Sequence, residues 1–274
     1  MILIRSCSGF DELEACVQLQ IDTWGYEQAD IMPRKAFLVM QKVGGQVIGA
    51  FDTGLPGASP QGGPGSLIGF AMSLPGVKSA ENFADGHARP YLHSHMLAVR
   101  EPYRNRGLGA QLKLEQRRDA LARGIRHMEW TFDPLEIKNA FLNIRKLGAI
   151  VRQYRENFYG VSSSRLQGGL PTDRLVAEWL LDSPRVHAVL EGRPAAAYEI
   201  TERITVPASI YQWKAAEADR ERALAVQATN RTLFQQAFSQ GLAVLGYQRD
   251  PQGNGVFELG PVTQLYPEIL GFQG

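Results

Sequence analysis

A six-residue turn carries the clearest chemistry in this sequence. It reads Arg104-Asn105-Arg106-Gly107-Leu108-Gly109 and lies between a predicted strand over Tyr91–Val99 and a predicted helix. The first backbone amides of a helix have no internal partners, and the helix dipole favours negative charge at that end. The two glycines let a ligand approach the backbone closely, and the two arginines add positive charge. The turn is therefore predicted to bind a phosphorylated ligand.

Basic residues cluster around this turn, although the formal net charge of the 274-residue chain is only +1. That balance argues against a nucleic-acid-binding surface spread over the whole protein. A local excess of five positive charges instead suits a small polyanion, while a solvated basic helix face remains the alternative. The basic residues are Arg100, Arg104, Arg106, Lys113, Arg117, Arg118, Arg123 and Arg126, against Glu101, Glu115 and Asp119.

Three side chains are candidates for acid–base chemistry beside this ligand. His95 shares one predicted strand face with His93, and Glu129 and Asp133 lie on the next predicted strand. Histidines and carboxylates are the usual general bases. Each also has a structural alternative. His95 could be a hydrogen-bonded structural histidine, and Glu129 and Asp133 could be carboxylates at a sheet edge or at a helix cap. The five histidines and two cysteines form no recognisable ligand set, so we expect no metal.

The elements that must position these residues follow the order of an α/β protein. Strand and helix patterns predict a mixed, mostly antiparallel central sheet flanked by helices. Residues 1–182 are predicted to form the main domain, and residues 183–274 a smaller C-terminal α/β extension that packs on it. The predicted strands cover 1–5, 37–43, 46–52, 67–74, 91–99, 127–133, 149–159, 174–181, 200–206, 243–247 and 256–259. The predicted helices cover 8–24, 136–147 and 218–240, and a further helix follows the turn and runs to about residue 123.

Composition is that of a globular protein, and we expect a cytoplasmic location. No apolar run approaches the roughly 20 residues that span a bilayer, and Met1–Arg5 lacks the pattern of a secretory signal. We therefore expect no membrane association. Cys7 and Cys16 are expected to be free structural thiols in a reducing compartment.

The turn and its flanks resemble the GNAT acyltransferase superfamily. Its signature is Gln/Arg-x-x-Gly-x-Gly/Ala between a strand and a helix, and Arg104, Gly107 and Gly109 fill it. Leu97-Ala98-Val99 is similar to the apolar end of the family's strand. Arg145-Lys146-Leu147-Gly148-Ala149 resembles the ending of the family's next helix, with Ala149 in place of phenylalanine. The resemblance covers roughly residues 1–182.

The resemblance implies acetyl-CoA or another acyl-CoA as co-substrate and direct attack of an amine on the thioester. It implies that the strand end binds the pantetheine arm and the turn binds the pyrophosphate, with asparagines of the second helix reaching the cofactor. The cofactor-binding residues expected on this basis are Leu97, Ala98, Val99, Arg104, Asn105, Arg106, Gly107, Leu108, Gly109, Ala110, Asn139 and Asn143.

One family feature is missing, because Ile144 stands where the family usually has the tyrosine that protonates the departing thiolate. Tyr154 or Tyr159 takes that role, or the thiolate leaves without a dedicated acid. The chain is most similar to a long subgroup of predicted acetyltransferases, linked to N-acylation of amino acids with succinyl as one acyl group. We expect a small amine as acceptor, and a homodimer remains open. The alternative function is a non-catalytic sensor or scaffold that binds acyl-CoA.

Overall fold

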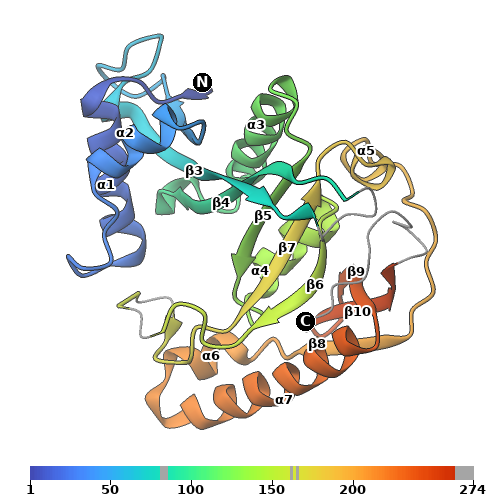
Figure 1. The fold of residues 1–274 in the computed structure, drawn as a ribbon. Coiled ribbons are helices and arrows are strands. Elements are labelled where there is room, and N and C mark those ends of the chain that lie inside the picture. The colour runs from blue at the N-terminus through green and yellow to red at the C-terminus, as the bar shows by residue number, and fades with distance from the viewer. Residues whose placement is uncertain (81–85, 161–162, 165–166, 263–274) are drawn as a thin grey trace. The chain divides into compact units, whose positions relative to one another are not determined.

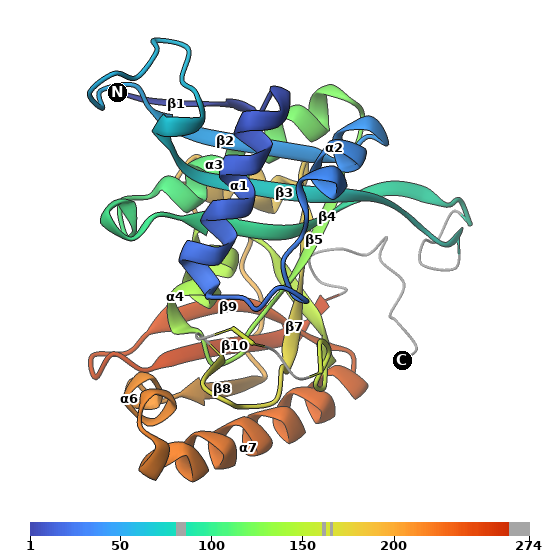
Figure 2. The same ribbon diagram turned by 90° about the vertical axis from the view of Figure 1, so that its left-hand side faces the viewer.

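The computed structural model describes residues 1–80, 86–160, 163–164 and 167–262 (Figures 1 and 2). The chain forms two compact units. The first comprises residues 1–76, 90–128 and 163–166, and the second comprises residues 77–89, 129–162 and 167–274.

The first unit is a twisted sheet covered by helices on both faces (Figure 2). Its strand order is β1-β2-β3-β4, and β1 and β3 both run antiparallel to β2. Helices α1 and α2 lie on one face and α3 on the other. The elements are β1 (Ile2–Ser6), α1 (Gly9–Trp24), α2 (Arg34–Lys42), β2 (Gln46–Asp52), the 3-10 turn η1 (Pro64–Ser66), β3 (Leu67–Lys78), β4 (Arg89–Val99), η3 (Glu101–Tyr103) and α3 (Leu108–Ala122).

Two apolar layers hold this sheet between its helices. Leu13 and Phe37 pack with Phe70 on the face of α1 and α2, whereas Ile68 and Leu112 pack on the face of α3. Phe70, Ala71 and Met72 alternate between the two layers, as the period of two requires. A register shift opposite Ala50 and Phe51 interrupts this alternation, so Ile68 lies in the layer opposite to that of Phe70. Cys7 and Cys16 lie in the first layer as free buried thiols with their sulfur atoms 3.8 Å apart. The reducing compartment stays a prediction.

The prediction of a strand over residues 37–43, before Gly44-Gly45, is wrong. This segment belongs to helix α2, which buries Phe37 on the sheet. Gly44 adopts a left-handed φ of 95°, and the Gly45 amide donates to the Met40 carbonyl at 2.7 Å. Two glycines in this arrangement end a helix in a Schellman motif, so the same dipeptide that favours a hairpin turn also favours a helix C-terminus.

The second unit contains a sheet in the order β5-β7-β6-β9-β10-β8. The C-terminal strands extend it, since β9 pairs with β6 and with β10, and β10 pairs with β8. Helix α7 packs along β6, β8 and β9 (Figure 1). The elements are β5 (His127–Phe132), α4 (Ile137–Ala140), η4 (Phe141–Lys146), β6 (Ile150–Arg155), β7 (Arg174–Leu180), α5 (Pro184–Leu190), β8 (Glu202–Val206), α6 (Ile210–Ala215), η6 (Glu217–Asp219), α7 (Arg220–Ser239), β9 (Leu242–Arg249) and β10 (Gly255–Pro261).

The helix predicted over residues 136–147 has an unexpected form. Only α4 is α-helical, and η4 is a π-helix in which the Leu147 amide donates to the Leu142 carbonyl five residues earlier. The wider turn leaves Ile144 buried but Phe141 only half-buried. Single π-helical turns of this kind concentrate at functional sites. Sequence periodicity also missed α5 and α6, which are short.

The predicted fold class is confirmed, because the protein is a mixed α/β structure with mostly antiparallel pairing and helices on the sheet faces. The domain boundary at residue 182 stays a prediction. Two strands are longer than predicted, since β3 reaches Lys78 and not residue 74, and β4 starts at Arg89 and not at Tyr91. Residues 81–85 lie outside the described part. In the part of the chain that the structure describes, no helix is long and apolar enough to cross a membrane.

Candidate active site

The predicted turn joins β4 to the N-terminus of α3. Strand β4 ends at Val99, η3 follows, and the first amide bonded within α3 is that of Gln111, which donates to the Gly107 carbonyl at 3.1 Å. The amides of Leu108, Gly109 and Ala110 precede it, and helix geometry gives amides at these positions no intrahelical acceptor. Together with the helix dipole, they form a site for an anion.

Gly107 is suited to a close ligand. It caps α3 with a left-handed φ of 81°, a conformation that other residues adopt at a cost. A Cβ atom built on Gly107 would meet no heavy atom within 4 Å, so the space beside this backbone is open. Asn105 is also left-handed, with φ 60°. The turn therefore presents its backbone on an open side, which fits a phosphate group.

The two arginines of the turn behave differently from each other. The Arg104 Nε donates to the Val99 carbonyl at 2.9 Å and thus ties the turn to the end of β4. The Arg106 guanidinium lies 5.9 Å from the ring centre of Tyr103, whose hydroxyl donates to Asp52 at 2.7 Å. Among the described residues, no carboxylate lies within ion-pair distance of either arginine. Both therefore keep positive charge for an anionic ligand.

Lys113 does not contribute to this surface charge, contrary to the prediction. It is only 4% exposed and its Nζ donates to the Ser94 hydroxyl at 2.8 Å. Ser94 in turn donates to Gln116 Oε1 at 3.0 Å, between α3 and the sheet. Burial holds the pKa of Lys113 well below its usual value. A lysine at helical spacing gives no sequence signal of such burial, so this polar cluster was missed.

His95 lies on the strand that leads to the turn. Its ring centre is 6.1 Å from that of His93, and both side chains are half-buried on β4. Burial, and then the nearby His93, lower the pKa of His95 from its ordinary value of 6.5. The imidazole is therefore neutral at pH 7, which is the form that accepts a proton. Leu97 follows two residues later on the same face of the strand.

The two candidate carboxylates are engaged within the second unit. Glu129 forms a short ion pair with Lys78. Asp133 accepts from Lys214 Nζ at 2.8 Å and, with its other oxygen, from the Leu135 amide at 2.8 Å. The Asp133 side chain thus accepts a hydrogen bond from the backbone of the turn that follows β5. Their catalytic roles stay predictions. No group of three or more His, Cys, Asp or Glu side chains that could hold a metal occurs in the described ranges.

Tyr154 belongs to a buried network rather than to an open surface. Its hydroxyl donates to Asp173 at 2.5 Å, and Asp173 also accepts from Arg231 Nε at 3.0 Å and from the Asn157 amide at 3.0 Å. Burial and the hydrogen bond to Asp173 raise the pKa of Tyr154. The alternative acid, Tyr159, shares a hydrogen bond of 2.9 Å with Thr131.

This network predicts a large stability effect for Asp173→Asn. Asp173 is fully buried, and the change leaves Arg231 without one of its carboxylates. Breaking a buried ion pair costs about 3–5 kcal/mol, and we expect roughly 2–4 because Arg231 is partly exposed and retains Glu156. Urea denaturation measures the loss. Asp219→Asn, which removes an exposed pair with Arg222, serves as the control and should leave the midpoint unchanged.

The asparagines expected at the cofactor differ in burial. Asn139 is exposed on α4, whereas Asn143 is buried within η4 and its carbonyl accepts from the Ala149 amide at 3.0 Å. Ile144, at the position of the family's tyrosine, is fully buried. The assignment of both asparagines to the cofactor stays a prediction.

Solved structures that share the fold of this protein include the following two. No protein-family model and no curated protein sequence matches the chain. The chain is similar to NAA60 of Arabidopsis thaliana in complex with acetyl-CoA, at 16% identity and a TM-score of 0.53, over 67% of this chain and 100% of that chain. It is also similar to the same protein in complex with a bisubstrate analogue, at 19% identity and a TM-score of 0.50, over 65% and 97%. At these identities the similarity concerns the fold.

Proposed function

We propose that this protein, whose fold is that of the GNAT acyltransferases, is an acyl-CoA-dependent N-acyltransferase acting on a small amine such as an amino acid. The observation that carries the proposal is the N-terminus of α3. There, open backbone at Gly107 coincides with amides that lack intrahelical acceptors and with the charges of Arg104 and Arg106. A fold shared with an acetyltransferase supports the same conclusion.

The residues present fit the phosphates of coenzyme A. The amides from Arg106 to Ala110 would hold the pyrophosphate, and the backbone of Leu97–Val99 would hold the pantetheine arm. When bound, acyl-CoA supplies an acyl group activated as a thioester. The chain supplies position and charge: the helix dipole and the two arginines neutralise the phosphates, and Arg104 fixes the turn against β4.

His95 is the general base in this proposal. The choice rests on the position of His95 on the strand that leads to the turn. His95 precedes Leu97 by two residues on the same face of β4, and it is neutral at pH 7 because its pKa is lowered. A neutral imidazole there removes the proton from the acceptor ammonium, so that the amine can attack.

One observation favours a second function, a non-catalytic acyl-CoA-binding sensor. Ile144 supplies no proton donor at the position where the family carries its acid, and Tyr154 is tied to Asp173. The two functions differ in a single respect, since both bind acyl-CoA but only the enzyme turns it over.

Release of free thiol distinguishes them. The purified protein is incubated with acetyl-CoA or succinyl-CoA and a panel of amino acids and simple amines, and the thiol is followed with a colorimetric reagent. We expect amine-dependent release that saturates with one acceptor class, with one of the two acyl donors preferred. Binding of acyl-CoA without release for any amine would contradict the enzymatic proposal and support the sensor.

A further inference from the structure

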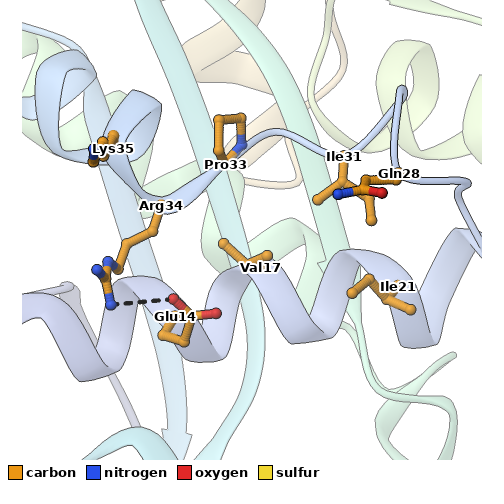
Figure 3. A pocket seen from close by; sticks show the side chains of 8 residues that line it. All are labelled: Glu14, Val17, Ile21, Gln28, Ile31, Pro33, Arg34 and Lys35. Carbon is orange, nitrogen blue, oxygen red and sulfur yellow. Dashed lines mark ion pairs between the residues drawn. The ribbon is translucent and has the colours of Figure 1, made fainter.

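The outer side of α1 and α2 carries an open groove of about 540 Å³ (Figure 3). Val17 and Ile21 project from α1 toward Ile31 on the connecting segment, and Glu14 and Arg34 form an ion pair of 3.3 Å at one end. The groove therefore combines apolar side chains in its middle with charged side chains at that end. Its lining residues are Glu14, Val17, Ile21, Gln28, Ile31, Pro33, Arg34 and Lys35.

An exposed aromatic side chain lies beside this groove on the same helix. Phe10 is 59% exposed in the first turn of α1. It precedes Val17 by seven residues, which is two helical turns or about 10 Å. The Arg34 guanidinium lies 5.3 Å from the ring centre of Phe10 and also pairs with Glu14. The exposed Phe10 side chain and the groove thus lie on the same surface, and Arg34 lies between them.

The same surface is apolar and charge-segregated beyond the groove. Leu38, Val39 and Val43 on and after α2 are each at least 43% exposed. Exposed apolar patches on a soluble protein mark interaction sites. The exposed acidic residues lie on α1, and the exposed basic residues lie on α2. They are Asp11, Glu14 and Asp22 on α1, and Arg34, Lys35 and Lys42 on α2. Within the chain, Glu14 pairs with Arg34 and Asp22 pairs with Arg100, whereas Asp11, Lys35 and Lys42 have no ion-pair partner among the described residues.

We propose that this surface is the two-fold interface between two copies of the chain, in which Phe10 of each copy fills the groove of the other. A two-fold axis brings the same surface of two molecules together, so each projection meets the partner's depression and every contact is made twice. With the two α1 helices antiparallel, the acidic α1 of one copy also lies against the basic α2 of the other. The proposal is independent of the acyltransferase function.

Sedimentation velocity over a micromolar concentration series tests the proposal. The wild-type protein is expected to sediment as a dimer, and Phe10→Glu as a monomer, with the dimer dissociation constant raised at least about 100-fold because a charge replaces a buried anchor. The double variant Phe10→Glu/Val17→Lys should recover part of the dimer. Its introduced carboxylate in one copy meets the introduced ammonium of the other.

Phe158→Glu is the matched control, because Phe158 is a similarly exposed phenylalanine (48%) in the second unit. It should leave the dimer unchanged. Far-ultraviolet circular dichroism confirms that each variant is folded. A wild-type protein that stays monomeric over the whole series would overturn the proposal, as would a dimer that Phe10→Glu does not weaken.

Discussion

Replacing His95 by glutamine is expected to lower kcat by about 100-fold or more, the usual contribution of a positioned general base. Glutamine keeps the size and hydrogen-bonding capacity of the side chain but cannot accept the proton of the acceptor. The half-buried site on β4 tolerates a polar side chain of this size, so we expect the variant to fold. Steady-state thiol release with a saturating acceptor measures the change.

The pH dependence of kcat gives a second readout for His95. Because burial and His93 lower the pKa of His95 from 6.5, the wild-type rate should fall only below pH 6.5, where the imidazole becomes protonated. The His95→Gln variant should lose this acid limb and keep a low, flat rate. His187→Gln, which changes an exposed histidine on α5, is the control and should alter neither rate nor profile.

His93→Gln should move the acid limb without abolishing activity. His93 is one of the two causes that lower the pKa of His95, and its removal lets that pKa rise toward 6.5. The midpoint of the acid limb should therefore shift to higher pH.

If His95→Gln kept the wild-type kcat and the wild-type pH profile, the proton transfer would belong to another group and not to His95.

The turn could be predicted from the sequence because its determinants are local. Gly107 is needed where φ is positive, Arg104 lies five residues after Val99, and a helix follows at once. These features involve neighbours in the chain, so spacing alone conveys them. The strands predicted over 243–247 and 256–259 were found for the same reason, since they form the hairpin β9–β10, which closes over a short loop around Asp250.

The surroundings of the candidate residues depend on partners far away in the chain. Tyr154 and Asp173 are 19 residues apart, and Asp133 and Lys214 are 81 apart. No single-sequence pattern specifies such pairs, because the tertiary fold alone brings them together. Lys113 illustrates the same limit, since only the packing of α3 on the sheet shows that a lysine is buried.

A strand was predicted over residues 37–43, where the structure has helix α2, and this prediction failed for a different physical reason. Gly44 and Gly45 permit both a tight hairpin turn and a helix-terminating motif, and the residues before them suit either state. Burial of Phe37 on the sheet selects the helix. Tertiary packing therefore decides between two locally acceptable conformations.

The most direct test of the central claim is calorimetric titration of the protein with acetyl-CoA and succinyl-CoA, repeated on Gly107→Glu. The substitution places a carboxylate at the N-terminus of α3 and a side chain in the open space beside its backbone. Gly57→Glu is the matched control, because Gly57 has a similar φ of 76° and equally open surroundings. We predict micromolar binding by the wild type and by Gly57→Glu, and affinity at least about 100-fold weaker in Gly107→Glu, a change of roughly 3 kcal/mol. Absence of binding by the folded wild type, or equal binding by Gly107→Glu, would contradict the account.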